Sequence, residues 1–146
     1  MFYTAASGYA IRALTYLAMQ PKDKDRALVR EIAEVAELPQ HFLGKVLQDL
    51  ARAGVLKSWK GPGGGFSLAR PAKEITLYHI ADALGETQQL NRCAVGFAEC
   101  SDAKPCTLHD QWKGVRQHLT DYLQRTTLQQ LAQAVQRKRA LLAESD

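Results

Sequence analysis

All three cysteines of this 146-residue chain lie in one short segment, residues 93–109. Their spacing is C-x6-C-x5-C, and a histidine follows the last cysteine by three positions. Glycine, alanine, proline and small polar residues fill the gaps, so the segment lacks the apolar repeat that predicts a helix or a strand. Three thiolates and one imidazole form a complete four-ligand set for an iron-sulfur cluster or a zinc ion. The sequence therefore predicts a metal centre in this segment.

Other uses of these cysteines remain open from the residues alone. A disulfide framework is typical of small secreted chains with an even number of cysteines, so free thiols or metal ligands are favoured here. The alternatives are a structural zinc site and a cluster-free switch that works by cysteine oxidation. An enzyme with Cys106 as nucleophile and His109 as base is a further class, although the sequence shows no third orienting residue and no oxyanion device.

The composition is that of a globular protein, with 46% apolar and 23% charged residues. No apolar run approaches the roughly 18 residues of a membrane span. The N-terminal residues 1–19 lack a basic n-region, and Arg12 interrupts their apolar part. We therefore expect a cytoplasmic protein that makes no membrane contact.

Positive charge is concentrated in one part of the chain. Residues 38–73 contain six basic residues against one acidic residue, a net charge of +5, whereas the whole chain has a net charge of +4. A localised basic face is the expected footprint of a polyanion-binding protein. A solvated charged surface is the alternative interpretation.

Three amphipathic helices are predicted in the N-terminal part, at residues 5–19, 29–36 and 39–53. Pro39 cannot continue the second helix but suits the start of the third, and Gly54 is the residue type expected just after a helix. The third helix is expected to bury Phe42, Leu43, Val46, Leu47 and Leu50. Two helices joined by a tight turn, the second with an amide-rich and cationic face, indicate a helix-turn-helix. A plain pair of packed helices is the competing interpretation.

A β-hairpin is predicted directly after the third helix. Residues 55–60 and 66–69 form its strands, and the glycine-rich residues 61–65 form the turn, as in the wing of a winged helix. Nucleotide-binding glycine motifs are not matched by this turn, whereas its flexible backbone could approach a phosphate or a narrow groove closely. The residues expected to contact DNA are Gln40, His41, Lys45, Lys57, Lys60, Gly63, Gly64 and Arg70.

The C-terminal part is predicted to be helical. A short helix at residues 77–84 begins after Thr76 and ends at Gly85. Beyond the cysteine segment, apolar residues recur at intervals of 4, 3, 4 and 3, which is typical of helices that pack along their length. These residues are Leu108, Trp112, Val115, Leu119 and Tyr122. A second copy of the chain is the simplest partner for this stripe, and the chain's own first helix is the alternative. Thr127 and Gln130 predict a capping box for a last helix, and the tail from Arg137 is expected to fray.

The chain resembles a known family in several of these features. It is similar to IscR/NsrR-type bacterial transcription regulators of the Rrf-two superfamily. Three features carry the similarity: the turn and second helix of the helix-turn-helix, LPQHFLGKVLQDLARAGVL, the wing, KGPGGGFSLAR, and the three cysteines before a long C-terminal helix. The resemblance covers residues 4–135. It implies a homodimeric winged-helix regulator, binding an operator in double-stranded DNA, whose iron-sulfur cluster senses cluster supply, iron, oxygen, redox state or nitric oxide.

The same resemblance implies a ligand set. The IscR pattern corresponds to Cys93, Cys100, Cys106 and His109, and it favours a [2Fe-2S] over a [4Fe-4S] cluster. The first cysteine gap has six residues where that pattern usually has five. In NsrR-type members an aspartate of the partner subunit can complete the site, and the matching position here is Gly8, which favours His109 as the fourth ligand. Gly44 replaces a glutamate of the IscR recognition helix, so DNA sequence preference is not carried over.

The expected architecture is mainly α with a small β-hairpin, namely a winged helix-turn-helix followed by a long C-terminal dimerisation helix. Three functional units are expected. Residues 1–85 form the winged helix-turn-helix DNA-binding domain, residues 86–107 the cluster-binding loop, and residues 108–146 the dimerisation helices and tail.

Overall fold

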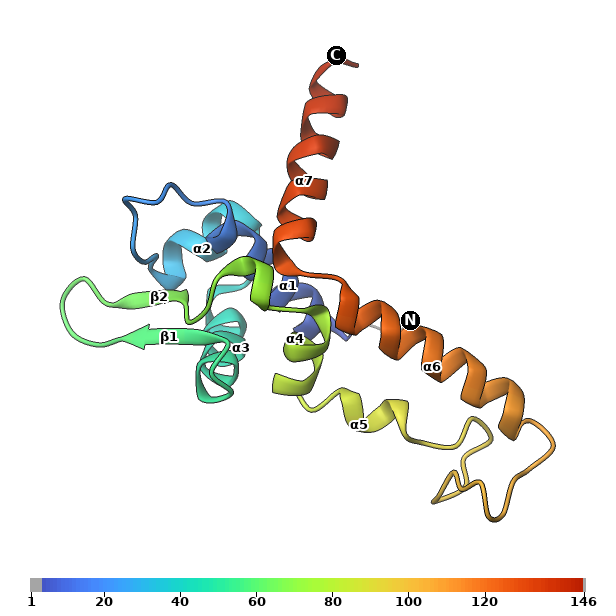
Figure 1. The fold of residues 1–146 in the computed structure, drawn as a ribbon. Coiled ribbons are helices and arrows are strands. Elements are labelled where there is room, and N and C mark those ends of the chain that lie inside the picture. The colour runs from blue at the N-terminus through green and yellow to red at the C-terminus, as the bar shows by residue number, and fades with distance from the viewer. Residues whose placement is uncertain (1–3, 146) are drawn as a thin grey trace.

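The computed structural model describes residues 4–145, and Figure 1 shows its elements in chain order. The outer limits of the predicted first and last units, residues 1–3 and 146, lie outside the described residues. The helices and strands are α1 Ala5–Ala18, α2 Val29–Ala36, α3 Gln40–Arg52, β1 Leu56–Trp59, β2 Gly65–Leu68, the 3-10 helix η1 Ala72–Glu74, α4 Leu77–Ala83, α5 Thr87–Leu90, α6 His109–Arg125 and α7 Leu128–Ala143. This order confirms the predicted mainly helical winged helix-turn-helix.

Helices α1, α2 and α3 pack together because each has one apolar side. Leu14, Ile32 and Leu47 are completely buried between them. Burying a leucine or isoleucine side chain contributes about 1.5–3 kcal/mol relative to leaving it exposed. The left-handed conformation of Glu37 ends α2, and Pro39 stands at the N-cap of α3, so the chain turns within three residues.

The prediction of a buried Phe42 is wrong. Leu43, Val46, Leu47 and Leu50 are buried as expected, but Phe42 is 43% exposed. Its ring lies edge-on to the ring of Tyr9 in α1, with the centroids 5.3 Å apart. Phe42 lies at the edge of the apolar stripe of α3, where the neighbouring helix covers only part of a large side chain.

The wing is an antiparallel hairpin in which Leu56 pairs with Leu68 and Trp59 pairs with Gly65. Its strands agree with the predicted ones to within one residue at each end. Ala27, in the loop before α2, forms an isolated bridge with Phe66, and backbone N–H groups donate in both directions at 2.9 and 2.8 Å. The wing is therefore attached to the helical domain by backbone hydrogen bonds as well as by its own chain.

Two threonines cap helices α4 and α7. Thr76 and Thr127 each form a capping box, with His79 and Gln130 as the partners, and the two threonines also form an isolated bridge. The capping box at Thr127 and the N-cap at Thr76 were both predicted. The side chain of His79 accepts a hydrogen bond from the Thr76 backbone N–H at 3.1 Å, so His79 has a structural role.

Helices α6 and α7 leave the domain in different directions (Figure 1). The end of α6 and the start of α7 are anchored by Leu123 and Leu128, which are completely buried, and α7 packs against α1 and η1. The tail does not fray at Arg137 as predicted, because α7 continues as a helix to Ala143. Alanine, leucine, arginine and lysine after Arg137 are good helix formers, which is sufficient to extend the helix. Helix α5 and η1 were not predicted.

Across residues 4–145, no helix combines the length and the apolar character that a membrane crossing requires.

Candidate functional site

The cysteine segment connects α5 to α6 and folds around a cavity of about 340 Å³. All four predicted ligands line this cavity. Its lining residues are Cys93, Phe97, Glu99, Cys100, Ser101, Lys104, Pro105, Cys106 and His109. The three cysteines are half-buried free thiols. The structure thus brings together the donor atoms that are spread over residues 93–109 in the sequence.

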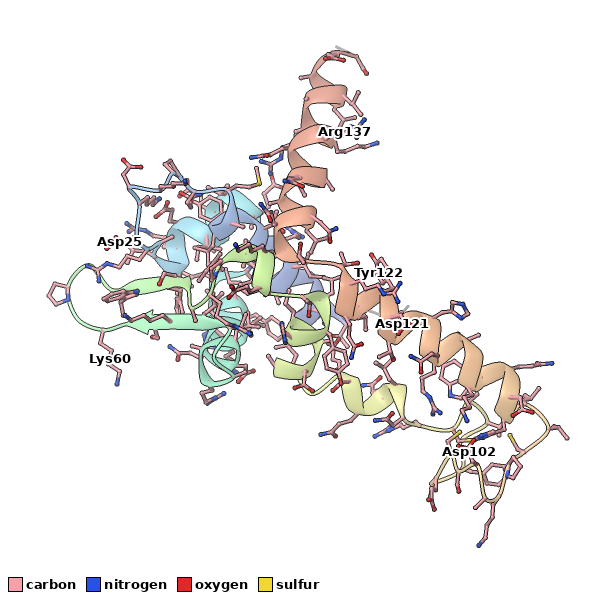
Figure 2. All side chains as sticks on the ribbon, in the orientation of Figure 1. Asp25, Lys60, Asp102, Asp121, Tyr122 and Arg137 are labelled. Atoms are coloured by element: carbon pink, nitrogen blue, oxygen red, sulfur yellow. The ribbon has the colours of Figure 1, made fainter. Side chains whose placement is uncertain are left out.

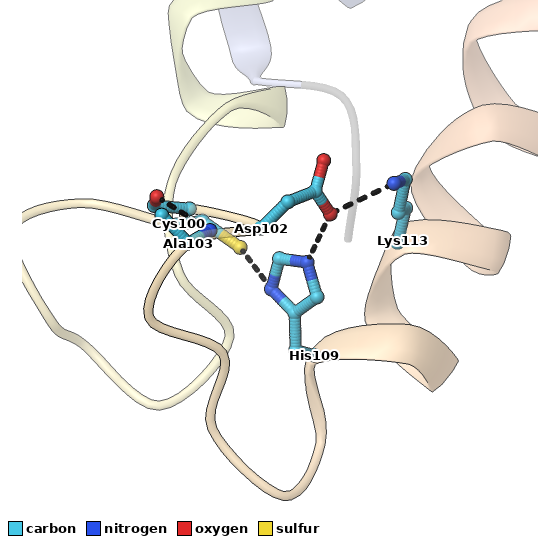
Figure 3. Close-up of polar contacts among 6 residues, drawn as sticks. Cys100, Asp102, Ala103, His109 and Lys113 are labelled. Carbon is cyan, nitrogen blue, oxygen red and sulfur yellow. Dashed lines mark hydrogen bonds and ion pairs between the residues drawn. The ribbon is translucent and has the colours of Figure 1, made fainter.

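His109 is the first residue of α6, and its side chain is only 4% exposed. Its Nδ1 atom lies 3.4 Å from Cys100 Sγ, and its Nε2 atom lies 2.8 Å from Asp102 Oδ1 (Figure 3). The imidazole therefore stands between a thiol on one side and a carboxylate on the other. Residue 102 was not predicted to belong to the site, since an acidic residue in a loop gives no periodic signal.

Asp102 also binds the next turn of α6. Lys113 Nζ lies 2.8 Å from Asp102 Oδ1, the oxygen that faces His109. The pKa of Asp102 is lowered to about 2, first because Lys113 donates a hydrogen bond to the carboxylate and then because His109 does. Asp102 is itself exposed to solvent, so this ion pair is a means of orienting groups rather than a large source of stability.

The loop backbone favours the thiolate form of Cys93. The pKa of the Cys93 thiol is lowered, chiefly because backbone N–H groups of Val95 and Phe97 point toward the sulfur, with a smaller contribution from the Cys106 thiol. Thiolate is the form that binds metals. Cys93 and Cys106 both line the cavity, while Cys100 faces His109.

Within residues 4–145, no three His, Cys, Asp or Glu side chains are grouped closely enough to hold one ion. A cluster contains more than one iron, so its ligands need not surround a single point. Three thiols and an imidazole that line one cavity suit an iron-sulfur cluster by donor type.

Helix α6 begins without a side-chain cap, because Leu108 occupies its N-cap position and makes no such hydrogen bond. A turn precedes the helix, in which the His109 N–H donates to the Cys106 carbonyl at 3.0 Å. The thiol nearest to His109 is that of Cys100 rather than that of Cys106.

A second concave surface lies between the wing, the start of α2 and α3. This groove has a volume of about 630 Å³. Four of the residues predicted to contact DNA line it, namely Gln40, Lys60, Gly63 and Gly64. Arg30, Gln48, Ser58 and Trp59 line it as well and were not predicted. Arg30 could have been found from its place on the polar side of α2, in the first turn of that helix.

The remaining predicted DNA contacts lie around this groove. His41 and Lys45 are exposed on α3, and the Lys57 Nζ lies 4.1 Å from the centre of the Trp59 ring. Figure 2 shows Lys60 extending from the wing away from the helices. Arg70 lies at the base of the wing and not at its tip, because the hairpin register places it beyond Leu68.

The predicted stripe on α6 divides into two parts. Leu108, Val115 and Tyr122 are exposed, whereas Leu119 packs against the core of its own chain. Trp112 is half-buried, and its indole N–H donates to the Arg92 carbonyl at 2.9 Å. One part of the stripe thus packs within the chain, and the other part lies open.

Comparison with known proteins gives consistent results. Residues 3–134 match the family model described as "Rrf2: Iron-dependent Transcriptional regulator". A proposed HTH-type transcriptional regulator of Aquifex aeolicus is 36% identical over 90% of this chain and 91% of its own length. The regulator IscR of Pectobacterium atrosepticum is 28% identical over 90% of this chain and 79% of its own length.

Among solved structures, CymR, described as the global cysteine regulator of B. subtilis, has a TM-score of 0.75 with this chain. It is 23% identical, and the match covers 90% of this chain and 96% of CymR. This likeness shows the shared fold, a two-stranded wing on a helix-turn-helix with long C-terminal helices.

The fold and the groove beside the wing define a class, that of winged helix-turn-helix DNA-binding transcriptional regulators. Within this class the chain belongs to the Rrf2 family, as the match over residues 3–134 shows. The family consists of transcriptional regulators and not of enzymes, which agrees with the expectation from the sequence.

Proposed function

We propose that this regulator is a homodimer that senses iron-sulfur cluster status, redox state or nitric oxide through a cluster bound by Cys93, Cys100, Cys106 and His109. The observation that supports this most strongly is the convergence of these four side chains on one cavity. The family's description as iron-dependent and the similarity to IscR agree with it. A [2Fe-2S] cluster is favoured over [4Fe-4S], because a fourth donor is already present in the chain.

The residues of the loop have distinct roles in this proposal. Each cysteine loses its proton when it becomes a ligand, and the backbone N–H groups around Cys93 assist that loss. Lys104 lines the cavity and offsets part of the negative charge of three thiolates. A bound cluster would supply electron transfer and sensitivity to oxidants. His109 contributes a neutral ligand, which raises the reduction potential relative to a fourth thiolate.

Dimerisation is proposed to use the open part of the α6 stripe. The exposed apolar residues Leu108, Val115 and Tyr122 lie on a helix that leaves the domain, and a second copy can cover them symmetrically (Figure 1). Recognition helices in such a dimer must read half-sites about 34–36 Å apart. Because the cysteine loop leads directly into α6, ordering the loop can change how the two DNA-binding domains are spaced.

The predicted division into units is retained as a functional proposal. Residues 1–85 bind DNA, residues 86–107 hold the cluster, and residues 108–146 dimerise. The limits are not boundaries between separate cores, because His109 belongs to the metal site and α7 packs against α1. The protein is proposed to act in the cytoplasm, where its operator DNA is found.

Anaerobic purification tests the cluster directly. We expect a coloured protein that contains iron and sulfide but no stoichiometric zinc. A variant with all three cysteines changed to serine should lose the colour. It should also change its affinity for a DNA fragment selected in vitro with the cluster-loaded protein. If wild type never takes up iron and sulfide, and the serine variant binds DNA as wild type does, the proposal is wrong.

A thiol switch without a cluster is the second candidate. It is favoured by the presence of Cys93 and Cys106 in the same cavity and by the lowered pKa of Cys93. Hydrogen peroxide would convert the two thiols to one disulfide, with two molecules of water as the other product. Mass spectrometry of peroxide-treated protein would show a linked pair of peptides, one with Cys93 and one with Cys106. The mass of this pair would be lower than the sum of the two free peptides by two hydrogen atoms.

A further inference from the structure

We propose that Asp102 is a positioning residue that determines which ring nitrogen of His109 is presented to the cavity, making Nδ1 the ligand atom. This inference rests on the proposed cluster and deepens it, because it concerns the state of a ligand before any metal is bound. It assigns a role to a side chain that is not among the four donors.

The first step is a hydrogen-bond argument. His109 Nε2 lies 2.8 Å from Asp102 Oδ1. An ionised carboxylate can only accept hydrogen bonds, so Nε2 must carry the hydrogen and donate it. In the neutral ring the other nitrogen, Nδ1, then carries the free electron pair. The tautomer of His109 follows from the identity of its neighbour.

The second step concerns what Nδ1 faces. It lies 3.4 Å from Cys100 Sγ, and both residues line the same cavity. The ring is 4% exposed, so solvent does not compete strongly for either nitrogen. A thiol hydrogen on Cys100 can point to the Nδ1 electron pair in the metal-free protein. Metal binding would release that hydrogen and use both atoms as ligands.

The third step explains why the carboxylate stays in place. His109 and Lys113 are four residues apart on α6 and therefore share one face of the helix. Lys113 Nζ lies 2.8 Å from the same Oδ1 atom that accepts from His109 (Figure 3). Asp102 thus bridges the loop to two successive turns of α6. The ring is held from behind, on the side away from the cavity.

Carboxylates commonly orient metal-binding histidines in this way, and removing one typically costs about 10-fold to 100-fold in metal affinity. The same arrangement is present here, because the Asp102 carboxylate binds Nε2 of His109 while Nδ1 of the same ring faces the cavity. Asp102 is 72% exposed, so replacing it leaves no buried void and should not unfold the protein.

The ring state can be measured without any metal. In protein labelled with ¹⁵N in its histidine rings, we expect the His109 signals of the Nε2–H tautomer, assigned by their loss in His109→Gln. Asp102→Ala should shift the His109 population toward a mixture of tautomers, and Asp102→Glu should partly restore it. Asp110→Ala removes an exposed acidic residue from the first turn of α6 and should leave the ratio unchanged. A wild-type ratio in Asp102→Ala would overturn the inference.

A second measurement tests the consequence for the ligand. Anaerobically reconstituted Asp102→Ala should lose iron to a chelator about 10-fold faster than wild type or Asp110→Ala. An unchanged rate of loss would also overturn the inference. If wild type takes up no iron and sulfide at all, the proposed cluster is wrong, whereas the tautomer measurement still decides whether Asp102 orients the ring.

Discussion

At the scale of single residues, Gly65 allows the close approach between the wing and the helical domain. Gly65 has φ +127°, and a Cβ atom built there would lie 2.3 Å from the Ala27 carbonyl oxygen. That carbonyl accepts the Phe66 N–H, so it cannot move without breaking the bridge between the wing and the helical domain. Gly44 in α3 differs, since nothing lies within 4 Å of its Cβ position.

These two glycines predict opposite effects of the same substitution. Gly65→Ala should lower the free energy of unfolding by about 1–3 kcal/mol, because it combines strained backbone with a clash. Gly44→Ala should raise it by about 0.5–1 kcal/mol, since alanine restricts the unfolded chain and suits a helix. Urea denaturation of both variants measures this. A Gly65→Ala protein as stable as wild type would contradict the tight contact with Ala27.

At the scale of elements, a carboxylate on α2 adds polar contacts to the apolar packing between α2 and its neighbours. Glu31 accepts hydrogen bonds from Lys24 in the preceding loop and from the Tyr16 hydroxyl on α1. The pKa of Glu31 is lowered from its usual 4.5, first by the bond from Lys24 and then by the bond from Tyr16. The position of α2, and hence of the groove beside it, depends partly on an ionised group.

The sign of this shift predicts a pH dependence. A lowered pKa in the folded state stabilises the protein above the unfolded value of 4.5, and this contribution is lost as the pH falls through the folded value. Wild type should therefore lose more thermal stability than Glu31→Gln when the pH is lowered from about 5 to about 3. The difference should be modest, because the pair is partly exposed. Glu34→Gln, an exposed change on the same helix, is the control and should follow wild type.

The position of Lys60 on the wing leads us to expect that it contacts a DNA phosphate. Lys60→Ala should weaken binding to all DNA sequences and reduce the slope of log affinity against log salt by about one unit, as expected for one lost phosphate contact. Lys138→Ala on α7 removes the same charge far from the wing and should leave the slope unchanged (Figure 1). Equal slopes for wild type and Lys60→Ala would remove Lys60 from the interface.

At the scale of the whole molecule, the wing and the cysteine loop lie at opposite ends (Figure 1). No direct contact can therefore carry a signal from the loop to the DNA-binding groove within one chain. Helix α6 begins at the loop and ends beside the core, where Leu123 is completely buried. In the proposed dimer, a change at the loop can reach the DNA-binding domain of the second copy by changing how the two copies meet along α6.

This arrangement predicts that dimerisation can be removed without unfolding the chain. Val115 is 56% exposed, so Val115→Glu should give a folded monomer. Its affinity for a two-half-site operator should fall by at least about 10-fold, because the second half-site no longer binds as part of the same complex. Gln124→Glu adds the same charge on the opposite face of α6 and should remain dimeric. Analytical ultracentrifugation distinguishes the two, and a dimeric Val115→Glu protein would contradict the proposed interface.

Much of the fold followed from short-range patterns in the sequence. The limits of α2 were predicted correctly, as were the residues that end α3 and α4 and the capping box at Thr127, since helix periodicity and caps depend on neighbours within about four residues. The four donors could be named because their types alone suit a metal. Phe42 was misjudged because its exposure depends on how far α1 reaches across α3.

Only the tertiary structure decided which groups meet. Cys100 rather than Cys106 faces His109, and Asp102 stands behind the ring, because turns without a repeating pattern place them there. The division of the α6 stripe into a packed and an open part likewise depends on where α4 and the core end. Sequence by itself determined the candidate donors, the caps and the periodic faces, which are local properties. Their distances and their exposure come from long-range packing, which no local pattern encodes.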